Sequence, residues 1–187
     1  MSTQTIQPVK FTYDDFCLFP DDGKRHELID GEHCMSPSPV TKHQRVSSNL
    51  HLLLGLFVKE KKLGTLLAAP MDVVLSDLDV VEPDLLYISR ARAEIITQKN
   101  IQGAPDLIIE ILSESSRKTD EIIKRKIYER HGVAWYWIVD PELETVKIYQ
   151  WQAGRYLRVA DLSHEADDAL TSALFPGLSA PLEEIFE

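Results

Sequence analysis

The sequence is poor in cysteine, in long apolar runs and in positive charge. Its two cysteines, Cys17 and Cys34, belong to no CxxC pair and lie near no histidine pair at zinc spacing, which argues against a structural zinc site. No apolar run approaches the roughly 20 residues of a membrane-spanning helix. Met1–Lys10 contains no apolar signal-peptide core. We therefore expect no membrane partner and a location in the reducing cytoplasm.

The formal net charge of −10 at pH 7 disfavours unspecific binding to nucleic acid, because phosphates attract Lys and Arg. The charge is unevenly distributed, however. The stretch 161–187 is strongly acidic, whereas one short segment is basic and contains Arg117, Lys118, Lys124, Arg125, Lys126 and Arg130. Two explanations stay open for this segment: it is a solvated helix face, or its local field steers a polyanion.

The pattern of apolar residues predicts one mixed α/β domain over residues 1–187. Helical spacing indicates a long helix over 41–62, a second over 117–131, and shorter helices over 12–18 and 90–98. Extended runs predict strands over 65–69, 72–75, 85–88, 107–112 and 134–139. Hairpins are expected about Asp30-Gly31 and about Ala153-Gly154, and the residues after them form a tail. We therefore expect a mixed sheet flanked by helices.

Two acids stand in apolar surroundings. Glu110 lies in the middle of Leu107–Leu112, and Asp84 precedes the run Leu85–Ile88. A buried carboxylate without a partner is costly, so each acid needs a cation. For Glu110 a buried arginine or an edge strand is an alternative to a metal ion, and for Asp84 a polar strand start is equally common. Together, the two acids favour a divalent metal ion.

The helix after Glu110 offers a positive charge. Asp120, Lys124 and Tyr128 follow one another at four-residue spacing, about 100° around the helix from Ile123 and Ile127. We expect the two isoleucines to face the core, with Lys124 at the boundary. Lys124 then either pairs with Asp120 as surface decoration or extends back toward Asp84 and Glu110.

With these residues in place, the chain resembles the Uma2 family, a former domain of unknown function in the PD-(D/E)XK restriction-endonuclease-like superfamily. The resemblance covers nearly the whole chain. The blocks that carry it are Glu27-Leu28-Ile29-Asp30-Gly31-Glu32, Met35-Ser36-Pro37-Ser38-Pro39, His43-Gln44-Arg45-Val46, Glu82-Pro83-Asp84-Leu85, Glu110-Ile111-Leu112-Ser113, Arg117 with Asp120, Lys124 and Tyr128, and Gly132-Val133 with Tyr136-Trp137-Ile138-Val139-Asp140-Pro141.

The resemblance implies a restriction-endonuclease-like core of one helix, three strands, one helix and one strand, with extra hairpins at both ends. It also implies a metal-dependent endonuclease that hydrolyses DNA. Asp84, Glu110 and the main-chain carbonyl of Ile111 would hold Mg²⁺ or Mn²⁺, which polarises the scissile phosphate and activates a water. The superfamily lysine normally lies two residues after the second acid, where this chain has Leu112. Lys124 is the expected substitute.

The resemblance implies weaker roles for further residues. Glu27 or Glu32 could supply another carboxylate, and His43 and Gln44 could contact a phosphate or the attacking water. For each of these residues a purely structural or solvent-facing role stays open. Candidate DNA contacts are Arg117, Lys118 and Lys126.

The sequence leaves two alternative functions open and leads us to expect a particular assembly state. A non-catalytic binding or assembly module is the main rival, favoured by Leu112. A carboxylate-pair sugar hydrolase is a distant third, because the sequence predicts no aromatic-rich cleft. A homodimer is also expected. If Lys124 is a boundary residue, Lys124→Ala should abolish DNA cleavage and cost little stability.

Overall fold

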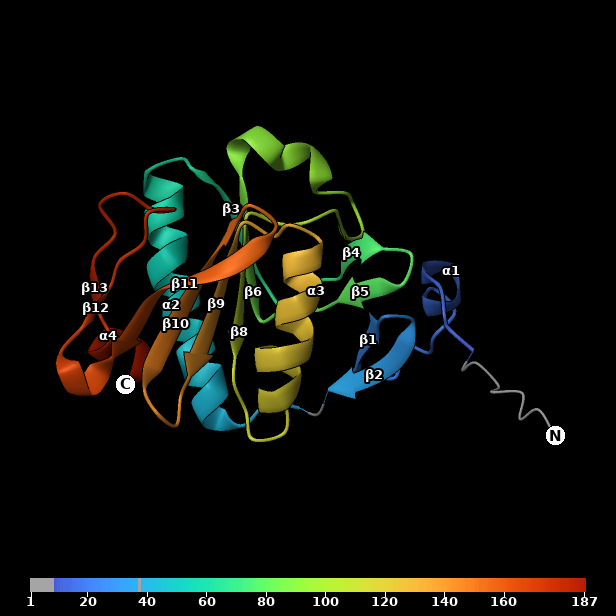
Figure 1. Cartoon of the computed structure of the whole chain (residues 1–187), viewed down its shortest axis with the longest axis horizontal. Helices are drawn as coiled ribbons and strands as arrows, with labels where there is room; N and C mark the ends of the chain where they lie inside the picture. The colour runs from blue at the N-terminus through green and yellow to red at the C-terminus, as the bar shows by residue number, and fades with distance from the viewer. Residues whose placement is uncertain (1–8, 37) are drawn as a thin grey trace.

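The computed structural model describes residues 9–36 and 38–187; Pro37, in one of the family-like blocks, lies outside them. A six-stranded sheet with the order β11-β10-β9-β8-β6-β3 forms the centre (Figure 1). Neighbouring strands are antiparallel except β8 and β9, which run parallel. The strands are β3 (Gly64–Ala68), β6 (Leu85–Ser89), β8 (Leu107–Ile111), β9 (Trp135–Asp140), β10 (Thr145–Gln152) and β11 (Arg155–Ser163).

A second sheet has the order β2-β1-β5-β4-β7 and contains the early hairpin. The hairpin turns at Asp30 and Gly31, as predicted, and both residues have positive φ. The sequence reading missed β5, and a two-stranded sheet pairs β12 with β13. These strands are β1 (Arg25–Ile29), β2 (Glu32–Ser36), β4 (Val73–Ser76), β5 (Asp79–Val81), β7 (Ile101–Gln102), β12 (Ala169–Leu170) and β13 (Ala180–Pro181).

The helices follow the predicted core order: α2, then β3, β6 and β8, then a second helix, then β9. That second helix begins with a π-helical segment, η2, and continues as α3. The expected helix over 90–98 is a shorter 3₁₀ segment. The helical elements are α1 (Tyr13–Phe16), α2 (Thr41–Glu60), η1 (Arg90–Ile95), η2 (Thr119–Lys124), α3 (Arg125–Arg130), η3 (His164–Ala166) and α4 (Glu183–Phe186).

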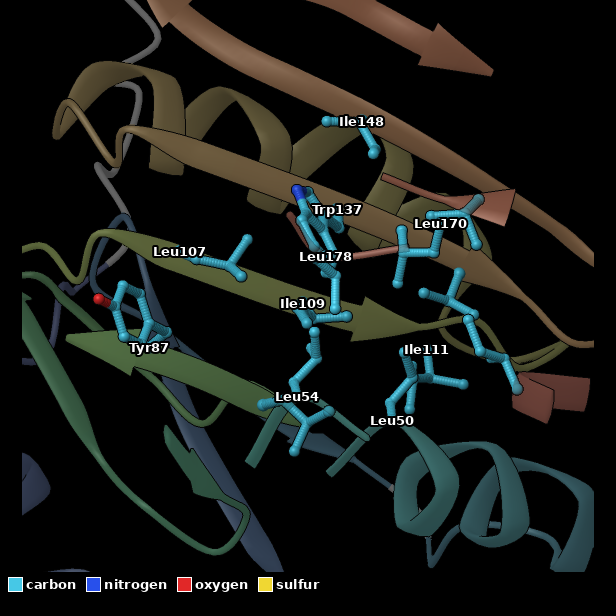
Figure 2. Close-up of a cluster of buried hydrophobic side chains, with 14 of the residues drawn as sticks. Leu50, Leu54, Tyr87, Leu107, Ile109, Ile111, Trp137, Ile148, Leu170 and Leu178 are labelled. Carbon is cyan, nitrogen blue, oxygen red and sulfur yellow. The ribbon is translucent and has the colours of Figure 1, made fainter. Parts of the chain in front are cut away.

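α2 and α3 cover opposite faces of the six-stranded sheet (Figure 1). Successive side chains of a strand point to opposite faces, and β8 is buried on both. Ile109 and Ile111 lie in one apolar cluster with Leu50 and Leu54 of α2 and with Trp137 (Figure 2). The apolar run predicted as a central strand therefore lies in the middle of the sheet.

The C-terminal segment is not the tail that the sequence suggested. Phe175, Leu182 and Ile185 are buried in the same apolar cluster as α2, and α4 packs against that helix. Phe175 makes an edge-to-face contact with Trp137 at a ring separation of 6.1 Å. The prolines and acids of this stretch concealed short elements whose apolar residues complete the core.

Among the described residues, no helix combines the length and apolar character that a membrane crossing requires.

Candidate active site

Asp84 and Glu110 come together where β6 meets β8. Glu110 belongs to β8, and Asp84 directly precedes β6. The two strands pair with Leu85 opposite Ile109, which brings Asp84 to the position opposite Glu110. Both acids line one cavity, and only 6% and 2% of their surfaces are exposed. The predicted juxtaposition on one face is confirmed.

Both carboxylate oxygens of Asp84 are engaged. Oδ1 accepts a hydrogen bond from Nη1 of Arg25 at 3.1 Å. Oδ2 accepts one from the Ile111 N–H at 2.8 Å and lies 3.1 Å from Nε2 of His43. Burial works to raise the pKa of Asp84, but the contacts with His43, Arg25 and Ile111 outweigh it and hold that pKa below its ordinary value. Asp84 is therefore ionised at neutral pH.

Arg25 is a site residue that the sequence analysis missed. Its Nε lies 2.5 Å from Oε1 of Glu82, and its guanidinium also donates to the Glu82 carbonyl and to Asp84. Burial raises the pKa of Glu82 in spite of the nearby guanidinium. The strand pattern held a signal, because Arg25 and Glu27 are two residues apart and so share a face of β1.

Lys124 lies among three buried carboxyl groups. Its Nζ is 2.8 Å from Oε1 of Glu27, 3.1 Å from Oε1 of Glu110 and 3.7 Å from Oδ1 of Asp120. The Tyr128 hydroxyl donates to Oε1 of Glu110 at 2.6 Å. These five residues are called the lysine cluster below. The predicted orientation of Lys124 toward the acids is confirmed, and Asp120 belongs to the same cluster.

The predicted facing of this helix is right for Ile127 but wrong for Ile123 and for the boundary position of Lys124. Ile123 is 39% exposed, whereas Asp120, Lys124 and Tyr128 are buried together with Ile127. The π-helical turn of η2 is the reason, because its wider winding changes which side chains face the sheet. The Tyr136 hydroxyl donates to the Asp120 carbonyl at 3.0 Å. Apolar spacing based on a regular α-helix could not reveal this turn.

The lysine cluster holds more acid than base, and its pKa values reflect this excess. Burial raises the pKa of Glu110 to about 8, against the pull of Lys124 and with support from the neighbouring acids. Burial likewise raises the pKa of Asp120 to about 6. Burial works to lower the pKa of Lys124, but Glu110, Glu27 and Asp120 together hold it well above its ordinary value. Lys124 therefore stays charged, and Glu110 carries a proton over part of the neutral range.

A cavity of about 740 Å³ opens onto these residues. Its walls come from β2, the start of α2, the loop after β8 and the loop after β9. In the loop after β8, Ser113 and Ser116 bond reciprocally through hydroxyls and main-chain N–H groups at 3.1 Å. Leu112, at the superfamily lysine position, is buried and also lines the cavity.

Of the four residues with weaker predicted roles, two lie at the cavity and two lie away from it. Glu27 is buried beside Lys124, and its Oε1 accepts the Glu82 N–H at 2.8 Å. His43 lines the cavity and contacts Asp84. Glu32 and Gln44 are exposed and stand outside the cavity lining, so the structure gives no support to a role for either.

The candidate DNA contacts divide in the same way. Arg117 lines the cavity, but its guanidinium is paired with both carboxylate oxygens of Asp140. Lys118 and Lys126 are exposed and lie outside the cavity lining. A contact between these two lysines and nucleic acid would therefore be made on the surface, away from Asp84.

The donor set fits a hard divalent cation. Across the described residues, no three His, Cys, Asp or Glu side chains lie close enough together to hold a metal ion, because the carboxylates contact protein cations instead. Carboxylate and carbonyl oxygens are the ligands that Mg²⁺ prefers. Because N–H and C=O of one residue point to the same edge of a strand, the Ile111 carbonyl faces the side of Asp84. Five buried acids share two cations, which would be an excess of three negative charges if every acid were ionised: Glu27, Glu82, Asp84, Glu110 and Asp120 against Arg25 and Lys124.

Comparisons with known proteins agree with this architecture. A crystal structure described as a "putative nuclease belonging to DUF820" from Anabaena variabilis ATCC 29413 superimposes with a TM-score of 0.79. The match covers 96% of this chain and 98% of that chain at 23% sequence identity, so it establishes the fold. A search of curated proteins found no match. The model of the Uma2 family, described as "Putative restriction endonuclease", matches residues 12–183, and the chain belongs to that family.

Proposed function

We propose that this protein is a metal-dependent endonuclease that hydrolyses DNA phosphodiester bonds. The observation that carries the proposal is the position of Lys124, whose Nζ lies 3.1 Å from Glu110 although Leu112 occupies the superfamily's lysine position. Leu112, directly after β8, supplies no charge to the site, and Lys124 from the following helix supplies one instead. Membership of the Uma2 family supports the same reaction class.

Asp84 and Glu110, with the Ile111 carbonyl, are the proposed ligands for Mg²⁺ or Mn²⁺. When bound, such a cation supplies Lewis-acid polarisation of the phosphate and of the attacking water. His43 and the Ile111 N–H fix the Asp84 carboxylate in place through Oδ2. Glu27 is a further acid within the same buried group.

Lys124 has the charge and the place to stabilise the developing negative charge on the phosphate. Its ammonium stays protonated because three acids surround it. The Tyr128 hydroxyl orients Glu110 by donating to Oε1. These contacts preorganise the charged groups, so that little rearrangement is required of the protein when substrate arrives.

A non-catalytic binding module of the same fold is the second candidate. Two observations favour it: Leu112 is buried at the lysine position, and Asp84 already has partners on both oxygens. Such a site is electrostatically satisfied to a large degree by Arg25 and Lys124. A protein of this kind would bind without cleaving.

Cleavage of a labelled DNA oligonucleotide in Mg²⁺ or Mn²⁺ decides between these candidates. We expect the wild type to cut, and Asp84→Asn and Lys124→Ala to lose at least about 100-fold in rate, in line with removal of an electrostatic catalytic group. Lys126→Ala, on an exposed position of the same helix, should at most weaken binding and flatten its salt dependence.

Two results would overturn the assignment. Full cleavage by folded Lys124→Ala protein would remove Lys124 from the mechanism. A wild type that binds DNA but cuts in neither metal would favour the non-catalytic module. Circular dichroism of each variant at the assay temperature establishes that it is folded.

A further inference from the structure

The proposed reactive groups lie at the floor of the cavity rather than on an open surface. Asp84, Glu110 and Lys124 are 6%, 2% and 4% exposed. The cavity volume of about 740 Å³ falls in the range of roughly 300–1,000 Å³ that is usual for small-ligand pockets. Specific protein–DNA interfaces, in contrast, bury about 1,000–2,500 Å² of protein surface. A phosphate that contacts these buried groups must therefore enter the cavity.

The charge of the lining also differs from that of a duplex-binding surface. The lining contains six acids and four bases, and each base has an acidic partner. Arg25 pairs with Asp84, Lys42 with Glu142, Arg117 with Asp140, and Lys124 with Glu27 and Glu110. Proteins that hold a double helix by its backbone typically neutralise about 6–10 phosphates. This lining therefore offers little unpaired positive charge to a run of phosphates.

The exposed part of the cavity lining includes two large apolar side chains among polar ones. Met35 and Val40 line the cavity and are 57% and 63% exposed, beside the exposed polar residues Ser38, Glu114, Ser115 and Glu142. Exposed apolar side chains suit the flat faces of bases, which stack on apolar and aromatic groups once they leave a duplex. In an intact double helix these faces are covered by neighbouring bases, and the phosphates point outward instead.

We propose that the cavity accepts a single unpaired nucleic-acid strand and excludes the intact double helix. This inference rests on the nuclease function proposed above and specifies its substrate class. In this arrangement the bases next to the cut contact Met35 and Val40, and one phosphate reaches Asp84 and Glu110. The substrate is then an unpaired strand, a frayed end or a flap, rather than a continuous duplex.

The test compares one sequence in two forms. The first substrate is a 5′-labelled 20-nucleotide single strand, and the second is a blunt hairpin duplex that contains the same sequence. Each is incubated with the wild-type protein in Mn²⁺, and its cleavage rate and binding anisotropy are measured. We expect the single strand to be cut at least about tenfold faster. Because few phosphates are held, a plot of log affinity against log salt should have a slope no steeper than about −1.5, from about −0.7 per phosphate neutralised.

A double variant and a matched control test the contact of bases with Met35 and Val40. Met35→Ala combined with Val40→Ala should raise the KM for the single strand by about fivefold, which corresponds to about 1 kcal/mol of lost base contact. The control is Leu52→Ala, which removes an apolar side chain of similar exposure, 64%, from a position on α2 outside the cavity lining. It should leave KM unchanged.

The outcomes separate this inference from the nuclease proposal. Cutting of the duplex as fast as the single strand would overturn the inference while the nuclease function stands. Cutting of neither form would overturn the nuclease function, and the binding data would still decide the substrate class. Tighter binding to the duplex, or an unchanged KM in the double variant, would contradict the unpaired-strand cavity.

Discussion

The two faces of the six-stranded sheet are both buried, but different chemistry buries them. Toward α2, the side chains of β8 and β9 belong to an apolar cluster that includes Leu54, Ile109 and Trp137 (Figure 2). Toward α3, Glu110 of the same strand meets Lys124 and Tyr128. The first face is stabilised mainly by the removal of apolar area from water. The second also contains an apolar cluster, which includes Ile108, Ile127 and Ile138, but its stability depends in addition on the balance between desolvation and charge pairing around Glu110.

The contrast between the two faces separates the residues that mainly stabilise the fold from those that can respond to protons and metal ions. Apolar packing is largely insensitive to pH and salt, whereas a cluster of buried acids responds to both protons and metal ions. The π-helical turn of η2 directs Lys124 into the sheet, at the cost of leaving Ile122 and Ile123 45% and 39% exposed. A helix that gives up apolar burial in order to bury charge is typical of a functional site.

The largest expected effect is on the apolar face. Trp137→Ala should lower the free energy of unfolding by about 4 kcal/mol, because Trp137 is fully buried and its removal leaves a cavity. The loss should be the same at pH 5 and pH 8. Urea denaturation at both pH values measures it. Trp151, which is 39% exposed, provides the control, and Trp151→Ala should cost no more than about 1 kcal/mol.

The second effect sharpens the contrast on the charged face. Lys124→Ala should destabilise the metal-free protein by about 3 kcal/mol at pH 8, because it leaves Glu27 and Glu110 buried without their cation. This replaces the expectation of little cost, which assumed a boundary lysine. The loss should shrink at pH 5, below the raised pKa values of Glu110 and Asp120, where these two acids take up protons.

A surface lysine serves as the control for that variant. Lys147→Ala removes a partly exposed pair with Glu121 at 2.8 Å and should cost less than about 1 kcal/mol at either pH. A pH-independent loss in Lys124→Ala would mean that packing, and not charge, explains its effect.

A smaller effect of opposite sign is expected for Glu110→Gln. The folded-state pKa of Glu110 is raised from 4.5 to about 8, so its ionisation disfavours folding as pH rises through that interval. Glutamine removes this penalty and keeps an oxygen for the Tyr128 hydroxyl. The variant should be more stable than the metal-free wild type by about 1 kcal/mol at pH 8. At pH 4 the advantage should vanish, and a gain that persists there would contradict the assignment.

Sequence reasoning recovered the apolar face well, because period-two and period-3.6 patterns are direct consequences of burial. The run Leu107–Leu112 was predicted as a central strand, and the observed β8 covers Leu107–Ile111. The family-like blocks also brought Asp84, Glu110 and Lys124 to one site. The C-terminal core residues were missed because their elements are too short for either period to show.

On the charged face, the sequence could not predict contacts between residues far apart in the chain or a departure from regular helix geometry. Arg25 contacts Asp84 from a different sheet, across 59 residues of sequence. The inward direction of Asp120 follows from a π-helical turn, which no regular spacing encodes. Ile123 is partly exposed although it is apolar, whereas Lys124 is buried beside the acids that require a cation.

Metal binding tests the central claim most directly, namely that the buried acids at Asp84 and Glu110 form a metal site. The melting temperature of the wild type, Glu110→Gln and the exposed-acid control Glu32→Gln is measured with and without Mn²⁺ at pH 7. At 100 times its Kd, a ligand that binds only the folded state stabilises it by about 2.7 kcal/mol. We predict a clear rise for the wild type and for Glu32→Gln, and none for Glu110→Gln. An equal rise in Glu110→Gln, or no rise in the wild type, would contradict the claim.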